Sequence, residues 1–300
     1  MIALVVEGTD WHARVLMQAF AALGVRARPV NLQSCGIETR RMFGLNIAGL
    51  DDRLPDAVLV RSMSGGTFQA VTLRLGILHA LRENGVLVWN DARAIERCVD
   101  KSMTSFLLAQ AGIPTPDTWA VESRETARAI VRRESMHGPL VLKPLFGSQG
   151  RGLKLISSQD DLPDAEAVAG VYYLQRYVAV EGGDGFRDFR LLVSRGRVVA
   201  AMARQAASWI TNVKQGGRPM AVVSGKELNE LAVRATAAVG AAFAGVDILY
   251  GADGRATVLE VNSMPAWSGL QKVTRASIAT ILAGDLVAAF AAGEARGAMV

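Results

Sequence analysis

Two apolar segments near the end of the chain each carry one acidic residue in their interior. They span residues 246–250 and 256–262, and their acids are Asp247 and Glu260. The dipeptide Asp253-Gly254 between them is typical of a two-residue hairpin turn, and such a turn places Asp247 directly opposite Glu260. Directly opposed carboxylates on neighbouring strands repel each other. The hairpin is therefore either a site where both acids share a cation or a solvated sheet face that carries them.

The neighbouring residues favour a particular cation. Asn262 lies two residues beyond Glu260 and points to the same side of the strand. Carboxylate and amide oxygens favour Mg²⁺ or Mn²⁺ over zinc, and an incomplete set of this kind is usually completed by phosphates. We therefore predict that Asp247, Glu260 and Asn262 are metal ligands.

A glycine-rich loop follows the apolar strand at residues 140–143. The strand ends at Lys143, three glycines lie within residues 147–152, and a second strand begins near residue 153. Glycine N–H groups can close over an anion, and a lysine at a strand end can reach phosphate oxygens. The loop is not a P-loop, because the lysine precedes the glycines and a strand follows. An ordinary hairpin loop remains the alternative, and a phosphate-type loop beside the paired acids argues against a glycosidase.

Strand and helix patterns alternate in the N-terminal third. Apolar strands at residues 2–6, 57–60 and 86–89 are separated by helices that begin near Asp10 and Thr67. This alternation predicts a small parallel sheet. A Rossmann dinucleotide site is excluded, because the first strand-to-helix turn holds one glycine where the fingerprint needs three.

The charge balance limits the possible partners. The chain has 33 Lys+Arg and 28 Asp+Glu, a net charge of +5, but its basic residues are scattered and only 6% of residues are aromatic. Nucleic acid is therefore a disfavoured partner, whereas a nucleotide is a suitable anion. No apolar run is long enough for a membrane span, and the two cysteines match no metal or redox spacing. We expect a cytoplasmic protein with reduced cysteines and no membrane partner.

Several motifs follow one another in the order typical of the ATP-grasp superfamily. They are Asp100-Lys101, residues 112–116, residues 141–150, Asp188-Phe189-Arg190, residues 245–249 and residues 259–262. Within that superfamily the chain resembles the RimK-type α-L-glutamate ligases over nearly its whole length. Residues 61–67 and Asn90-Asp91 resemble most the branch that acts on tetrahydromethanopterin-type one-carbon cofactors.

The resemblance implies an α/β chain with an ATP-grasp fold whose C-terminal two thirds are α+β. Three parts are expected: an N-terminal α/β domain at 1–95, a central subdomain with a phosphate lid at 96–186, and a C-terminal subdomain with the metal-binding hairpin at 187–300. ATP would lie between the second and third parts, and the acceptor would lie near the first.

The resemblance also implies a role for each matching position. The expected nucleotide-binding residues are Lys101 and Lys143 at the phosphates, Gly147, Ser148, Gln149 and Gly150 in the lid, Gln175, Arg176, Tyr177 and Val178 at the adenine edge, and Asp188 near the ribose. The expected catalytic residues, which face the transferring phosphoryl group, are Arg190, Arg204 and Asn212. The expected metal ligands are Asp247, Glu260 and Asn262, holding two Mg²⁺ (or Mn²⁺) ions.

The implied activity is an ATP- and Mg-dependent ligation that forms an amide through an acyl phosphate. L-Glutamate would be added to a small-molecule or peptide carboxylate, and the enzyme is expected to be a homo-oligomer. Residues 263–269 and Gln215-Gly216-Gly217 depart from the family pattern where substrate would sit, and Arg176 replaces an acid usual in the hinge. A D-alanine–D-alanine-type peptide ligase and a non-catalytic ATP-binding regulator are the alternatives.

A few residues remain open to two interpretations. Arg61 ends a strand ahead of a helix N-terminus, so it is either an anion-binding group or a solvated loop arginine. Asp188 and Arg190 lie on one face of a strand and, without the motif order, are interpreted as a surface ion pair. Trp267 is interpreted as a packing residue or as part of a pocket, and His12 as a structural or exposed residue.

Overall fold

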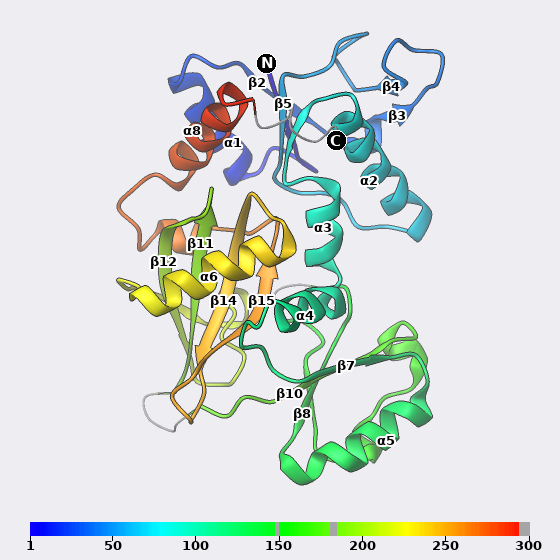
Figure 1. Cartoon of the computed structure of the whole chain (residues 1–300), viewed down its shortest axis with the longest axis vertical. Helices are drawn as coiled ribbons and strands as arrows, with labels where there is room; N and C mark the ends of the chain where they lie inside the picture. The colour runs from blue at the N-terminus through cyan, green and yellow to red at the C-terminus, as the bar shows by residue number, and fades with distance from the viewer. Residues whose placement is uncertain (148–149, 181–184, 294–300) are drawn as a thin grey trace.

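The computed structural model describes residues 1–147, 150–180 and 185–293. Three main sheets lie one after another along the long axis of the molecule, each with helices packed beside it (Figure 1). The N-terminal sheet lies at one end, the largest sheet in the middle, and the sheet of residues 118–176 at the other end. This arrangement confirms the predicted mixed α/β architecture.

The N-terminal sheet is parallel, as the alternation of strands and helices predicts. Its strands, in the order β2-β1-β5-β6, are β1 (Ile2–Val5), β2 (Ala27–Val30), β5 (Ala57–Val60) and β6 (Leu87–Trp89). Its helices are α1 (Trp11–Ala22), α2 (Phe68–Glu83) and α3 (Ala92–Val99), and a short ladder of β3 (Gly36–Ile37) and β4 (Leu45–Asn46) lies beside α2. Asp10 and Thr67 cap α1 and α2 through their side-chain oxygens. The sequence pattern misses β2, because Arg28 and Pro29 interrupt its apolar run.

The second sheet is antiparallel and lies on the helix α5 (Arg124–Glu134). Its strands, in the order β7-β10-β8-β9, are β7 (Thr118–Val121), β8 (Leu140–Lys143), β9 (Lys154–Ile156) and β10 (Tyr172–Arg176). Ile130 and Val131 of α5 share a core with Leu140 and Leu174 of the sheet. The helix α4 (Lys101–Gln110) connects this sheet to the N-terminal part.

The largest sheet has five antiparallel strands and is flanked by the helix α6 (Lys226–Val239). Its strands, in the order β13-β12-β11-β14-β15, are β11 (Phe186–Ser194), β12 (Arg197–Ala206), β13 (Arg218–Ala221), β14 (Phe243–Tyr250) and β15 (Ala256–Asn262). The short α7 (Ser268–Gln271) and the helix α8 (Ile278–Ala291) follow.

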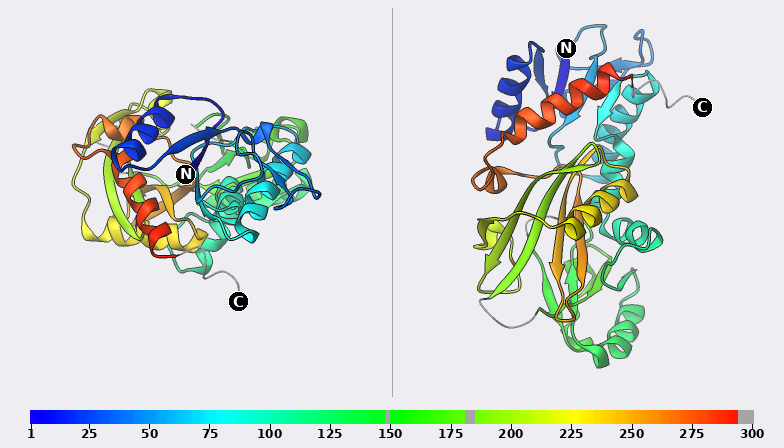
Figure 2. Two further views of the ribbon diagram at one scale, coloured as in Figure 1. Left: turned by 90° about the horizontal axis from the view of Figure 1, so that it is seen from above. Right: turned by 60° about the vertical axis from the view of Figure 1, so that its left-hand side comes forward.

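Helix α8 packs against α1 at the N-terminal end of the molecule (Figure 2). Its Leu282 and Leu286 share a core with Leu16 and Phe20 of α1. The end of the chain therefore completes the N-terminal core, and the predicted domain ranges 1–95, 96–186 and 187–300 remain a proposal. Within the described ranges, no helix combines the length and the apolarity that crossing a bilayer requires.

The β14–β15 hairpin confirms one prediction and corrects another. Asp247 pairs with Glu260, as predicted, but the two-residue turn at Asp253-Gly254 is wrong. Tyr250 pairs with Ala256, so the connection is longer than two residues. A bulge lies between Asp247 and Ile248 on one strand and Glu260 and Val258 on the other, so that Leu259 is the extra residue. The bulge compensates for the longer turn.

Asn90, at the end of β6, joins the N-terminal sheet to β14 and the residue after β15. It is fully buried, and its Nδ2 donates to the carbonyl oxygens of Phe243 and Ser263, both at 2.7 Å. Its Oδ1 accepts from the N–H groups of Ala242 at 2.6 Å and Phe243 at 3.2 Å. One side chain thus satisfies four backbone groups at this junction.

We expect Asn90→Ala to lower the free energy of unfolding by about 3 kcal/mol or more, because it leaves buried backbone groups without partners. Urea unfolding of the variant measures the change. Asn84→Ala, at an exposed position, is the matched control and is expected to cost less than about 1 kcal/mol. Equal small losses for both variants would contradict the proposed joining role.

Candidate functional site

A cleft lies between the second sheet and the largest sheet. It encloses about 1050 Å³, its open side included. The predicted site residues that line it are Lys101, Lys143, Gly147, Gly150, Gln175, Arg176, Tyr177, Val178, Asp188, Arg204, Asn212, Asp247 and Glu260. Arg190 and Asn262 do not line it, and Ser148 and Gln149 lie outside the described residues.

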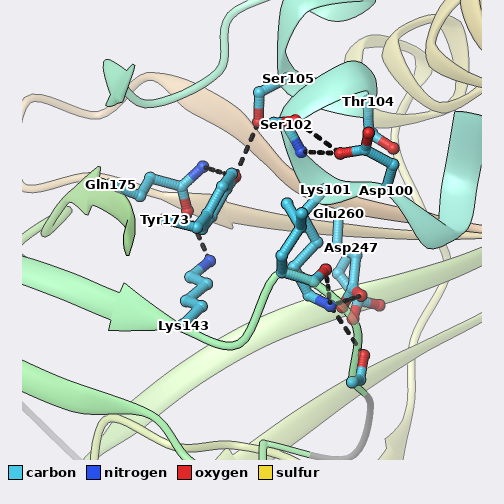
Figure 3. A network of polar contacts seen from close by, with 12 residues as sticks. Asp100, Lys101, Ser102, Thr104, Ser105, Lys143, Tyr173, Gln175, Asp247 and Glu260 are labelled. Carbon is cyan, nitrogen blue, oxygen red and sulfur yellow. Dashed lines mark hydrogen bonds and ion pairs between the residues drawn. The ribbon is translucent and has the colours of Figure 1, made fainter. Parts of the chain in front are cut away.

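Lys143 enters the cleft from the end of β8 and is held by a buried polar network (Figure 3). Its Nζ donates to Oε1 of Gln175. Nε2 of Gln175 donates to the hydroxyls of Thr118 at 3.2 Å and Tyr173 at 3.3 Å, and the Tyr173 hydroxyl lies 2.8 Å from that of Ser105. Burial lowers the pKa of Lys143 to about 8, although the nearby Glu260 acts in the opposite direction.

Lys101, the first residue of α4, lies between the glycine-rich loop and Glu260. Its Nζ donates to the carbonyl oxygens of Gly147 at 2.7 Å and Leu145 at 3.4 Å, and it lies 4.0 Å from Oε1 of Glu260. Burial lowers the pKa of Lys101, while Glu260 and Asp100 act to raise it. Lys101 and Lys143 thus place two ammonium groups in the cleft beside the glycine loop.

The low pKa of Lys143 predicts a pH dependence of nucleotide binding. Below pH 8 the side chain is cationic and attracts phosphate, and above pH 8 it loses its proton and this attraction. By proton linkage we expect the Kd for ADP to rise roughly tenfold between pH 7 and pH 9. Calorimetry across this range measures the change. Lys143→Arg, which stays charged, should show a much flatter profile, and an equally steep one would contradict the assignment.

Four charged side chains form a row of ion pairs across β12, β11 and β14. Arg190 donates to Asp247 through Nε at 2.7 Å and Nη2 at 2.6 Å, and Nη2 of Arg204 lies 3.0 Å from the same carboxylate. Arg204 also donates to Asp188, with Nε at 2.8 Å from Oδ1. The interpretation of Asp188 and Arg190 as a mutual surface ion pair is therefore wrong: each binds a partner on a neighbouring strand.

This row of ion pairs is largely buried, which sets its electrostatics. Burial alone would raise the pKa of Asp247, but Arg190 and Arg204 outweigh it and lower that pKa to about 2. Burial alone would lower the pKa of Arg204, but Asp247 and Asp188 outweigh it and raise that pKa. Asp247 is therefore ionised at neutral pH, the state that a metal ligand requires.

The predicted metal ligands fit Mg²⁺ by their chemistry. Asp247 and Glu260 pair across β14 and β15, and both line the cleft. In the described ranges, no three His, Cys, Asp or Glu residues gather around one point, so the available set is two carboxylates and the amide of Asn262. That set suits Mg²⁺, which usually takes one or two carboxylates and leaves other positions to phosphate and water. Nδ2 of Asn262 is buried without a partner among the described residues.

Gly150 of the glycine-rich loop lies against an irregular segment, residues 209–212, of which the sequence predicts only Asn212 as a site residue. Gly150 has φ +70°, and a Cβ there would come within 2.5 Å of Oδ1 of Asn212 and 2.9 Å of Cγ2 of Ile210. Only glycine therefore fits at this contact. Trp209 in the same segment lines the cleft and meets the Tyr177 ring edge-on at 6.1 Å between centroids. In the sequence, a tryptophan within a polar loop is the one feature that could have indicated Trp209 as a site residue.

The predicted hinge, residues 175–178, lines the cleft. The guanidinium of Arg176 pairs with Glu134 and lies 5.6 Å from the centre of the Trp119 ring. The side chain that differs from the family pattern at Arg176 is therefore bound by residues of α5 and β7. Among the described residues, the N–H of Tyr177 donates to Pro139 and that of Val178 has no acceptor.

Comparisons with known proteins agree with this geometry. A family model described as a RimK-like ATP-grasp domain matches residues 98–286. The tetrahydromethanopterin:alpha-L-glutamate ligase of Methanosarcina acetivorans is 31% identical over an alignment that covers 89% of this chain and 92% of that protein. A protein of Shewanella amazonensis named probable alpha-L-glutamate ligase 1 is 31% identical over 93% of this chain and 92% of its own length.

Solved structures show the same fold at lower identity. The ATP-grasp ligase PsnB, complexed with a phosphomimetic variant of its minimal precursor, Mg and ADP, has a TM-score of 0.76 at 23% identity, covering 96% of this chain and 98% of that chain. The D-cycloserine synthetase DcsG has a TM-score of 0.73 at 18% identity, covering 96% of this chain and 99% of that chain. At these identities the likeness concerns the fold.

Proposed function

Since this chain belongs to the RimK-like ATP-grasp family, whose members are ligases, we propose that it uses ATP to join L-glutamate to a carboxylate of a small cofactor or a peptide. The observation that carries the proposal is the cleft itself, in which two lysines, Arg204 and the paired acids Asp247 and Glu260 meet beside a glycine loop. Cations of this kind bind and orient phosphates, which is most of what phosphoryl transfer needs.

The proposed reaction has two steps. The acceptor carboxylate attacks the γ-phosphate of ATP, which gives an acyl phosphate and ADP. The amine of glutamate then attacks the acyl carbon, phosphate leaves, the amine loses a proton, and an amide forms. Water must be kept from the acyl phosphate, and we assign that role to the lid around Gly150, which meets Asn212.

Each group in the cleft has a proposed task. Lys101 and Lys143 bind the phosphates, Val178 meets the adenine edge and Arg204 faces the transferring group, with Asp188 holding the guanidinium in place. The metal ligands Asp247, Glu260 and Asn262 would hold two Mg²⁺ ions, which would offset the negative charge of the phosphates. Arg190 does not line the cleft and donates two hydrogen bonds to Asp247, so we propose that it positions this carboxylate.

The choice of substrate rests on the relatives. The Methanosarcina acetivorans protein is named for tetrahydromethanopterin and α-L-glutamate, and its similarity extends over nine tenths of this chain. We therefore propose a pterin-type cofactor carboxylate as the first acceptor to test. Self-association and a cytoplasmic location are part of the same proposal; light scattering on the purified protein tests the first.

The experiment is an ADP-release assay with ATP, Mg²⁺ and tetrahydromethanopterin or a cofactor-containing extract, to which each amino acid is added in turn. L-Glutamate is expected to drive release. Release driven by D-alanine without glutamate would overturn the choice of amino acid in favour of a D-alanine–D-alanine-type ligase. ATP binding without release under any condition would favour the non-catalytic regulator.

A further inference from the structure

Three buried side-chain nitrogens have no hydrogen-bond partner among the described residues. They are Nε of Arg61, Nε1 of Trp267 and Nδ2 of Asn262. All three are donors. Asn262 is the last residue of β15, and Trp267 lies in the segment that follows this strand. Unsatisfied buried donors are rare in folded proteins and point to a missing acceptor.

Arg61 is the most unusual of the three. Its side chain is buried, with 7% of the residue exposed. Among the described residues its guanidinium makes one hydrogen bond, 3.4 Å long, from Nη1 to the carbonyl of Met264. Its Cζ lies 5.1 Å from the centre of the Trp267 ring. Two exposed acids, Glu7 and Asp10, interact with the Arg61 guanidinium by charge attraction, without a hydrogen bond to it among the described residues. Beyond its cation–π contact with Trp267, the guanidinium has one long hydrogen bond in the described part of the chain, and a buried cation in that state is unfavourable unless a counter-ion binds. The interpretation of Arg61 as a solvated loop arginine is therefore wrong.

The position of Arg61 in the sheet indicates a ligand site. The sheet has the strand order β2-β1-β5-β6. After β1 the chain adds β2 on one side of it, and the next strand of this sheet, β5, is added on the other side. The direction in which strands are added therefore reverses between β1 and β5. Ligands of open parallel sheets bind at this reversal, beyond the carboxyl ends of the strands. Arg61 directly follows β5, and Glu7 lies beyond the end of β1. This edge faces the segment after β15, because Asn90 at the end of β6 bonds to Ser263.

The Trp267 ring is held in place by the N-terminal part of the chain. Nε2 of His12 accepts from the backbone N–H of Trp267 at 3.2 Å, and Nδ1 of His12 lies 3.0 Å from Oδ2 of Asp10. The imidazole also meets the indole edge-on, with 4.7 Å between centroids. Of the two predicted alternatives, structural or exposed, His12 is therefore the first, and it holds the indole beside Arg61.

We propose that Arg61 and the indole N–H of Trp267 form a subsite for a substrate carboxylate that does not itself react. A carboxylate brings acceptors and no donors, and its two oxygens match the planar guanidinium. The subsite rests on the proposed ligase function, and it would make this enzyme select a dicarboxylic substrate. The carboxylate comes either from the side chain of the incoming amino acid or from the tail of the acceptor.

The first experiment uses glutarate as a probe, in buffer of constant ionic strength with ADP and Mg²⁺. Glutarate is expected to raise the Tm of the wild-type protein in a saturable way, and the neutral glutaramide is not. Arg61→Gln should weaken glutarate binding at least about tenfold, and Trp267→Phe should do so by roughly the same factor. Arg93→Gln removes the same charge from an exposed position and is expected to behave as wild type.

Failure of the subsite and failure of the proposed function are distinguishable. Calorimetry with ADP should give wild-type affinity in every variant, and loss of ADP binding in the wild type would contradict the ATP-dependent function instead. If Arg61→Gln does not fold, the binding of glutarate to Arg61→Lys and Trp267→Phe, measured by the same shift in Tm, tests the subsite instead. The subsite is overturned if glutarate leaves the wild-type Tm unchanged, or if the variants bind it as the wild type does.

The second experiment identifies the source of the carboxylate by inhibition of turnover. Glutarate competitive with L-glutamate would assign the subsite to the incoming amino acid, and glutarate competitive with tetrahydromethanopterin would assign it to the acceptor. Either result supports the subsite. Competition with ATP, or with none of the three substrates, would overturn it.

Discussion

Replacing Lys143 by methionine is expected to lower turnover by roughly 10²–10³-fold, the usual loss when one group that stabilises the transition state is removed. ATP binding should weaken by about 10–100-fold, since a hydrogen bond to a charged group contributes ~1.5–3 kcal/mol. The reason is that this ammonium lies in the cleft beside the glycine loop and is held there by Gln175. ADP-release kinetics and calorimetry with ATP measure the two effects.

Lys154→Met is the matched control. Lys154 is exposed on β9, follows the same loop and does not line the cleft. It is expected to keep wild-type turnover and ATP affinity. Wild-type ATP affinity in Lys143→Met, with an unchanged Tm, would contradict the phosphate-binding assignment.

Glu260→Gln is expected to abolish Mg²⁺-dependent turnover while leaving the Tm of the metal-free protein within about 2 °C of wild type. Glu260 faces Asp247 across the hairpin and lies 4.0 Å from Lys101, so removing its charge relieves one repulsion and removes one attraction. The expected change is small because Arg190 and Arg204 already offset the charge of Asp247. Titration of Mg²⁺ in the ADP-release assay and thermal melts without metal measure the two quantities.

Glu230→Gln is the control for the loss of one negative charge. Glu230 is exposed on α6, pairs with Lys226 at 3.7 Å and does not line the cleft. It should keep wild-type Mg²⁺ dependence. A Glu260→Gln variant that turns over with the same Mg²⁺ requirement as the wild type would remove Glu260 from the metal site.

The central feature of the site could be predicted from the sequence, although by a route that the structure corrects. A two-residue turn after Ala252 and a straight ladder place Asp247 opposite Glu260. In the structure the turn is longer, which shifts the outer pairs by one residue, and the bulge at Leu259 restores the inner pair. Turn chemistry indicates that a hairpin exists, whereas its register depends on packing that a local pattern does not contain.

The row of ion pairs between arginines and carboxylates could not be predicted, for the same reason. The turn at Arg195-Gly196 is confirmed and, continued as a straight ladder, would place Asp188 opposite Ala203. A register shift between Leu192 and Val193 instead places Asp188 opposite Arg204. A slip of one residue exchanges the two faces of a strand, so this shift decides whether Arg204 meets the two acids.

The segment around Trp209 and the burial of Arg61 required the three-dimensional structure. Trp209 lies in neither a helix nor a strand, so periodicity does not indicate its direction. Arg61 is covered by residues about two hundred positions later in the chain, through Met264 and Trp267. Contacts of such long range depend on how the C-terminal part returns to the N-terminal sheet.

The most direct test of the proposed activity is mass spectrometry of a reaction that contains ATP, Mg²⁺, isotope-labelled L-glutamate and tetrahydromethanopterin or a cofactor-containing extract. We predict a product that is heavier than its acceptor by labelled glutamyl residues, with one ADP released for each residue added. ADP release without incorporation of the label, or a product that forms equally well when D-alanine replaces glutamate, would contradict the proposal that this chain is a glutamate ligase.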